Sequence, residues 1–66
     1  MSIALNDGDF KLELGQQVVI LVSGEQGEVI GRAQYLHDEN RYFVRYMAGD
    51  GRATEVWWNE SALTGD

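Results

Sequence analysis

The stretch RYFVRYMAGDGRATEVWW, residues 41–58, decides the fold, because it carries two β-rich runs around a glycine-containing link. The runs 41–47 and 52–58 are dense in aromatic and β-branched residues, which favour extended strands. The link AGDG, 48–51, is typical of a turn. The stretch therefore predicts an antiparallel β-hairpin.

The length of the turn decides which side chains share a face of this hairpin. A two-residue turn at Gly49-Asp50 would mix apolar and charged side chains on both faces. A three-residue loop, 49–51, in which Gly51 adopts the left-handed conformation of a bulge, separates them. The predicted pairs are Tyr42–Trp58, Val44–Val56 and Tyr46–Thr54 on one face, and Phe43–Trp57, Arg45–Glu55 and Met47–Ala53 on the other.

The uncharged face of the hairpin is the natural core face, which places Trp58 in the core and Trp57 outside. Contiguous large apolar side chains on the surface of a small domain are typical of an interface, and tryptophan and arginine are common among its hot spots. Alternatively, the N-terminal arm or the bent half of the second strand covers this face, and it is not an interface. We predict a protein-interaction face that consists of Trp57, Phe43, Met47, Arg45 and Glu55.

The rest of the chain also divides into short β-rich runs, which predict an all-β domain. The runs QQVVILV (16–22) and EVIGRAQY (28–35) read as strands, and Gly31 in the second predicts a bulge or sharp bend. NESAL (59–63) predicts one helical or 3-10 turn, capped by Asn59 and bringing Leu63 over an open end.

Four to five short, strongly bent antiparallel strands with a 3-10 turn near the C-terminus fit a small SH3-like barrel better than a sandwich, which needs more strands. We place this domain at residues 15–66. Residues 1–14 show no sustained periodicity and are predicted to form an arm that is flexible or loosely docked.

Composition narrows the function classes. Eleven acidic residues against five basic ones give a net charge of −6, which argues against nucleic acid as a partner. The longest apolar run, VVILV, is too short to cross a bilayer, and the N-terminus has no secretory signal pattern. We expect a soluble, cytoplasmic protein that contacts no membrane. Because 66 residues bury a modest core, pairing with a second copy is a further expectation.

Candidate catalytic and metal-binding groups are few. The chain has no cysteine and one histidine, which leaves little for a zinc site. HDEN (37–40) collects a base and two carboxylates, yet consecutive polar residues between strands are typical of a turn. SGEQGE (23–28) and AGDG lack the lysine and following helix of a phosphate-binding loop. We predict a non-enzymatic protein without catalytic residues, cofactor or metal.

Four motifs, GQ…V.I, GE.GEVIGRA.Y, Y.VRY.AGDGRA.E.WW and ESAL, span about three-quarters of the chain. Together they resemble small, mostly uncharacterised SH3-like barrel proteins encoded by bacteriophages, prophages and other mobile elements of bacteria. The resemblance implies origin, fold and a bacterial host cytoplasm, and it names no chemistry.

A second, more distant likeness, in the order G.V…G…G.V.G…Y.V…V…AL, is to the plasmid-borne type II dihydrofolate reductases. These SH3-like barrels build one active pore from four subunits. Where that family needs a last-strand Val-Gln-Ile-Tyr-Pro segment, this chain has Glu55-Val56-Trp57-Trp58-Asn59. The reductase activity is therefore not carried over. An oligomeric small-molecule-binding protein or enzyme with a site at a symmetry axis is the alternative function.

Overall fold

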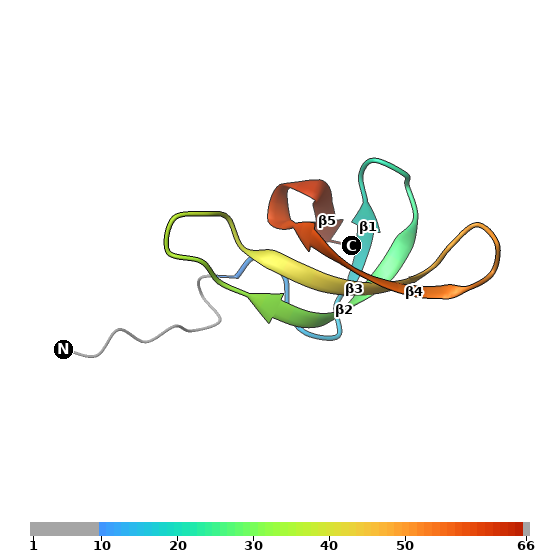
Figure 1. Cartoon of the computed structure of the whole chain (residues 1–66), viewed down its shortest axis with the longest axis horizontal. Helices are drawn as coiled ribbons and strands as arrows, with labels where there is room; N and C mark the ends of the chain where they lie inside the picture. The colour runs from blue at the N-terminus through green and yellow to red at the C-terminus, as the bar shows by residue number, and fades with distance from the viewer. Residues whose placement is uncertain (1–9, 66) are drawn as a thin grey trace.

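The computed structural model describes residues 10–65 and has five antiparallel strands in one curled sheet (Figure 1). The strand order is β4-β3-β2-β1-β5. The elements in chain order are β1 (Gln17–Ile20), β2 (Gln26–Ala33), β3 (Arg41–Met47), β4 (Ala53–Asn59), the 3-10 turn η2 (Glu60–Ala62) and β5 (Leu63–Gly65). The predicted all-β class, strand number and 3-10 turn are confirmed, and the arrangement is consistent with a small SH3-like barrel. Within the described part of the chain, no helix has the length and apolarity to span a bilayer.

The β3–β4 hairpin has the predicted register at every position from Arg41–Asn59 to Met47–Ala53. At its turn the Ala48 N–H donates to the Arg52 carbonyl at 2.8 Å, and the Gly51 N–H donates to the Ala48 carbonyl at 2.9 Å. Gly51 has a φ of 87°, which a residue with a β-carbon rarely adopts. The three-residue loop with a left-handed glycine is therefore confirmed.

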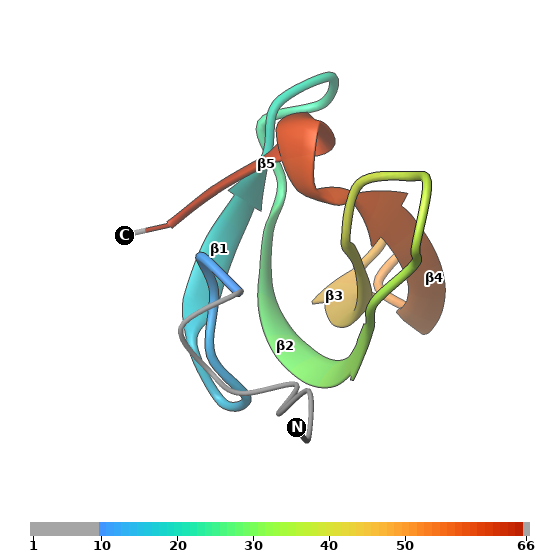
Figure 2. The same cartoon turned by 90° about the vertical axis from the view of Figure 1, so that its left-hand side faces the viewer.

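Strand β2 pairs with β1 along its first half and with β3 along nearly its whole length, so it must bend. The register with β3 shifts between Val29 and Gly31, which confirms the bulge or bend predicted there. Figure 2 shows β2 sweeping around between β1 and β3. This bend curls the sheet around its core.

The core is formed by seven buried side chains from the N-terminal segment and four of the five strands: Leu12, Val18, Ile20, Val29, Tyr42, Val44 and Leu63. Trp58 lies on the inner face as predicted, but it is only partly buried, at the margin of the core, where it meets Tyr46 edge to face at 6.4 Å. Trp58 therefore packs against the core, as its predicted face requires, but is not one of the fully buried core side chains. Its strand, β4, lies at an edge of the sheet and pairs only with β3 among the described residues.

The predicted arm, residues 1–14, falls partly outside the described residues, which exclude 1–9 and 66. Within residues 10–14, Leu12 is buried in the core. Phe10 meets Tyr42 edge to face at 6.1 Å, and the guanidinium carbon of Arg32 lies 4.6 Å from the centre of the Phe10 ring. Residues 10–12 therefore pack against the core side of the sheet.

The closing turn η2 is capped from another part of the chain. Asn59 makes no side-chain capping bond, so the predicted Asn59 cap is wrong. Instead the Glu39 carboxylate accepts a hydrogen bond from the Ser61 N–H at 2.7 Å and from the Ser61 hydroxyl at 3.1 Å. The Glu60 N–H donates to the Asn40 carbonyl at 2.9 Å. The loop before β3 thereby holds the end of β4 in place.

Candidate functional site

The five side chains predicted as an interaction face lie together on the outer face of β3 and β4. Tyr42 and Val44, which alternate with Phe43 and Arg45 along β3, are fully buried on the other face. Because side chains alternate along a strand, the five predicted side chains point outward. We call this set the outer patch: Trp57, Phe43, Met47, Arg45 and Glu55.

The centre of the outer patch is an aromatic stack. The rings of Phe43 and Trp57 are 4.9 Å apart, with 28° between their planes. Gly31 of β2 lies beside Phe43 in the sheet, as its cross-strand partner. A β-carbon added to Gly31 would lie 3.1 Å from the Phe43 Cβ and 3.7 Å from the Trp57 Cη2. The stack therefore extends across three strands, and Trp57 still leaves 48% of its surface exposed.

Charged groups that already have partners border this stack. The Arg45 guanidinium donates from Nη2 to Glu55 Oε2 at 2.6 Å and from Nε to the same oxygen at 2.9 Å. Arg41, on the other side of Phe43 along β3, pairs with Asp38 at 2.7 Å and lies over the Tyr35 ring at 4.9 Å. An exposed pair of this kind contributes about 0.2–1 kcal/mol to stability. The border of the stack is thus polar, and each of its two arginines is paired with a carboxylate of the same chain.

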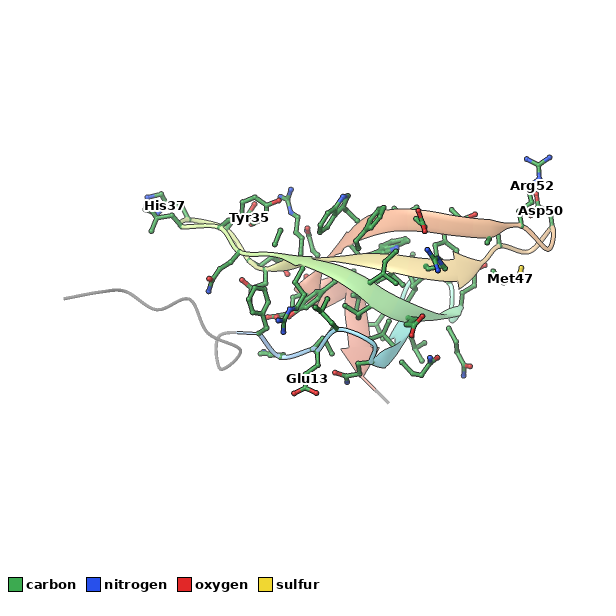
Figure 3. The ribbon with its side chains drawn as sticks, turned by 90° about the horizontal axis from the view of Figure 1, so that it is seen from below. Glu13, Tyr35, His37, Met47, Asp50 and Arg52 are labelled. Carbon is green, nitrogen blue, oxygen red and sulfur yellow. The ribbon has the colours of Figure 1, made fainter. Side chains whose placement is uncertain are left out.

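Met47 extends the outer patch toward the β3–β4 turn and is 61% exposed. Figure 3 shows it near the end of the hairpin, in the same region as Asp50 and Arg52. An apolar centre within a polar rim is the anatomy of protein interfaces.

Sequence reasoning missed a second cluster, centred on Tyr42 and Glu60. The Tyr42 hydroxyl accepts a hydrogen bond from the Leu12 N–H at 3.3 Å and donates a short one to the Glu60 carboxylate. The same carboxylate accepts from the Lys11 N–H and from the Asn40 side-chain amide, each at 3.4 Å. This cluster fastens the N-terminal segment to β3 and η2. Partners up to 49 positions apart leave no local signal in the sequence.

Burial and hydrogen bonding shift the pKa values of this pair in opposite directions. Burial, with the hydrogen bond to Glu60, raises the pKa of Tyr42. Burial alone would raise the pKa of Glu60, but the hydrogen bonds from Tyr42, Lys11 and Asn40 outweigh it and lower that pKa. At neutral pH the pair therefore consists of a neutral phenol and a carboxylate.

The lowered pKa of Glu60 predicts a loss of stability in acid. The folded state binds a proton at Glu60 less readily than the unfolded state, so its contribution is complete above the ordinary pKa of 4.5 and disappears as the pH falls through the folded value. Over that range, the free energy of unfolding should fall less steeply with pH in Glu60→Gln than in the wild type, measured by urea titration. Glu13→Gln, which removes an exposed carboxylate pointing away from the sheet (Figure 3), controls for the change of one charge. Equal slopes in all three proteins would contradict the assignment.

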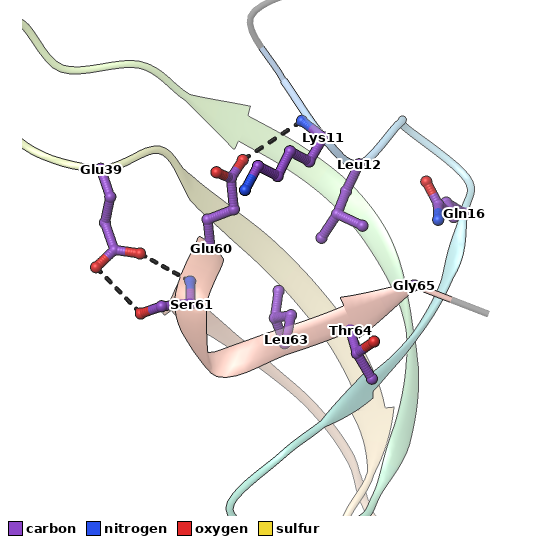
Figure 4. A pocket seen from close by; sticks show the side chains of 9 residues that line it. All are labelled: Lys11, Leu12, Gln16, Glu39, Glu60, Ser61, Leu63, Thr64 and Gly65. Atoms are coloured by element: carbon purple, nitrogen blue, oxygen red, sulfur yellow. Dashed lines mark hydrogen bonds between the residues drawn. The ribbon is translucent and has the colours of Figure 1, made fainter.

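A pocket lies beside this cluster, between the N-terminal segment, η2 and β5 (Figure 4). Its two carboxylates already serve the fold, since Glu39 caps η2 and Glu60 holds Tyr42. Its lining residues are Lys11, Leu12, Gln16, Glu39, Glu60, Ser61, Leu63, Thr64 and Gly65. Within residues 10–65 no group of three or more histidine, cysteine, aspartate or glutamate side chains is placed to hold a metal ion.

The HDEN loop, considered above for chemistry, has structural partners in three of its four residues. Asp38 pairs with Arg41, Glu39 caps η2, and Asn40 accepts the Glu60 N–H. His37 lies at the end of this loop, far from Met47 at the opposite end of the molecule (Figure 3), and does not line the pocket. The loop therefore closes the fold.

A scan against protein-family models and a search of curated proteins found no match to this chain. The resemblance to proteins of phages and mobile elements stays a prediction from the sequence motifs.

Proposed function

We propose that this chain is a small, non-enzymatic protein-interaction module that makes contact through the outer patch. The observation that carries the proposal is Trp57, a large aromatic residue stacked on Phe43 and still 48% exposed. A ring held by its neighbour loses little conformational freedom on binding. Each Å² of apolar surface that a partner covers contributes about 25 cal/mol.

Apart from Met47 and Trp57, the exposed large apolar side chains among residues 10–65 lie in loops and turns: Leu14, Leu21, Val22, Tyr35 and Leu36. Leu36, at 90% exposure, lies in the loop before β3, and Val22, at 81%, lies in the turn after β1. Scattered apolar residues of this kind are ordinary on protein surfaces. The outer patch differs because Phe43 and Trp57 are stacked on each other between two charge pairs, with Met47 beyond the Arg45–Glu55 pair.

Charge and sequence motifs extend the proposal. A net charge of −6 on 66 residues favours a basic partner surface and speeds the encounter with it. The motifs that resemble phage and mobile-element proteins support action on a protein of the bacterial host, or of the same element, in the cytoplasm.

Trp57→Ala should weaken partner binding by 2 kcal/mol or more, which is roughly a 30-fold loss of affinity, because hot-spot tryptophans contribute this much. The measurement is capture of host proteins, and of a differently tagged copy of the chain, on the immobilised protein, followed by titration of the captured species. Trp57 lies outside the buried core, so the variant should stay folded by circular dichroism, although it loses the stack, worth about 0.5–1.5 kcal/mol, as well as the area that the ring buries.

Leu36→Ala is the matched control, since it removes an exposed apolar side chain outside the outer patch. It should capture the same proteins as the wild type with the same affinity. Equal capture by Trp57→Ala and the wild type would contradict the proposed function.

A further inference from the structure

Strand β4 leaves one row of backbone groups that no strand of residues 10–65 pairs with. The bonds from the Glu60 N–H to Asn40 and from the Ala48 N–H to Arg52 mark hydrogen-bonded pairs at the two ends of the hairpin. Antiparallel ladders alternate, so Thr54, Val56 and Trp58 bond to β3, and the odd-numbered residues from Ala53 to Asn59 point their N–H and C=O groups away from it. Among residues 10–65, no strand pairs with this edge.

The free edge of β4 has none of the usual protection against pairing. Exposed edges are normally blunted by proline, lysine, a bulge or an inward-pointing charge. Residues 53–59 contain no proline and no lysine, and their register with β3 is unbroken. The one charged side chain, Glu55, is held by Arg45 on the outer face. The inner side of the same strand, at Val56 and Trp58, is only partly buried.

We propose that a second copy of this chain pairs antiparallel along β4, with the two-fold axis at Val56. In this register, residues whose N–H and C=O groups point to the free edge lie opposite each other in the two copies. Glu55 lies opposite Trp57 of the second copy, and Ala53 lies opposite its Asn59. It uses all seven residues of the strand. It also places Val56 against Val56 and Thr54 against Trp58 on the inner side, covering the half-buried face.

The neighbouring registers are poorer. An axis at Glu55 would put two carboxylates directly opposite each other, which is destabilising, and would shorten the paired segment to 53–57. An axis at Trp57 would shorten it to 55–59, because Ala53 would then face Ser61 in η2. Only the axis at Val56 pairs the full strand without placing like charges directly opposite each other; the two Glu55 residues, each held by its own Arg45, are then diagonal neighbours.

An axis perpendicular to the sheet keeps the outer faces of both copies on the same side. The two outer patches then form one surface, with the two Trp57 residues at diagonal positions roughly 7–8 Å apart. This doubled surface rests on the proposed function, whereas the pairing itself uses the backbone edge and the inner face. Because each copy carries a charge of −6, added salt should strengthen the dimer, while it would weaken the binding of a basic peptide strand at the same edge.

The cysteine-free chain allows a direct test of the register by disulfide formation. Opposite residues in a non-hydrogen-bonded pair have Cβ atoms about 4.5–5.5 Å apart, close to the separation in a disulfide. Val56→Cys should therefore form a covalent dimer under mild oxidation. Ala53→Cys should not, since each Ala53 would lie about 20 Å along the strand from its equivalent. No cross-linking of Val56→Cys, or equal cross-linking of both variants, would overturn the proposal.

A second pair of variants tests the hydrogen bonds. Glu55→Pro removes an outward N–H and leaves the ladder with β3 intact, and Glu55→Ala removes the same carboxylate but keeps the N–H. At equal concentration in light scattering, Glu55→Ala should have the mass of two copies and Glu55→Pro that of one. A dimeric Glu55→Pro would overturn the proposal. If Glu55→Pro loses its circular dichroism signal, the Val56→Cys result decides.

The two proposals fail separately. Specific cross-linking of Val56→Cys together with unchanged partner capture by Trp57→Ala would uphold the pairing and refute the outer patch as a binding surface. Absent cross-linking with lost capture by Trp57→Ala would refute the pairing and uphold the outer patch.

Discussion

Replacing Tyr42 with alanine is expected to lower the free energy of unfolding by about 3–5 kcal/mol. Tyr42 is fully buried and is the largest such side chain of the core. Its hydroxyl also joins the Leu12 N–H to the Glu60 carboxylate. A domain of this length has a total stability of about 3–10 kcal/mol, so the variant should be largely unfolded or marginal in a urea titration followed by circular dichroism.

Tyr42→Phe separates the two contributions of this residue. It keeps the ring in the core and removes only the hydroxyl, so its expected effect is smaller, about 1–3 kcal/mol. The remaining partners of Glu60, the Lys11 N–H and Asn40, limit the damage. If Tyr42→Phe and Tyr42→Ala were equally unstable, the packing of the ring would not be what holds the core together.

Gly27→Ala should destabilise the fold by about 3 kcal/mol, because β2 and β3 approach too closely there for a side chain. An added β-carbon would lie 2.6 Å from Val44 Cγ1 and 2.8 Å from the Arg45 carbonyl oxygen. The carbonyl oxygen belongs to the backbone and cannot move aside as the end of a flexible side chain can. The two strands must therefore separate. The measurement is the midpoint of urea unfolding.

Gly49→Ala is the matched control for Gly27→Ala. Gly49 lies in the β3–β4 turn with no atom within 4 Å of an added β-carbon and without a positive φ. Its replacement should leave stability unchanged or raise it slightly through the unfolded state. Equal midpoints for the two variants would show that the close approach of β2 and β3 is not a constraint.

The hairpin register was predictable from residues 41–58 because a shift of one residue would have mixed charged and apolar side chains on both faces. Gly31 marked the bend of β2 for a similar local reason. Both signals lie within one or two neighbouring strands, and both match the structure. The positions of Phe43 and Trp57 on one face follow from the same alternation.

The partial exposure of Trp58 was not predictable, because it depends on strand order. Residues 52–58 carry the pattern of a strand with one apolar face, and nothing in them says that β4 lies at an edge of the sheet. Similarly, the cap of η2 comes from Glu39, 22 positions before Ser61, whereas local rules point to Asn59. Long-range pairing decides both features, and local rules do not capture it.

The Glu60–Tyr42 cluster and the free edge of β4 share this origin. Each is set by which segments the sheet brings together or leaves apart, and each bears on stability or assembly. Composition already indicated that a chain of 66 residues gains from a second copy. The alternation of hydrogen bonds along β3 and β4 points to the edge of β4 as the place where that copy would dock.

We propose that β4 is the contact strand of this protein, through Trp57 and through the edge that no strand of residues 10–65 pairs with. The most direct test is the ¹⁵N–¹H spectrum of the wild type recorded from micromolar to millimolar concentration. We expect the amide signals of Ala53, Glu55 and Trp57 and the Trp57 indole signal to change together with concentration, while those of Gly24 and Gly49 stay constant. Signals along β4 that remain the same at every concentration, in a protein whose light-scattering mass is that of one copy, would contradict the pairing along β4.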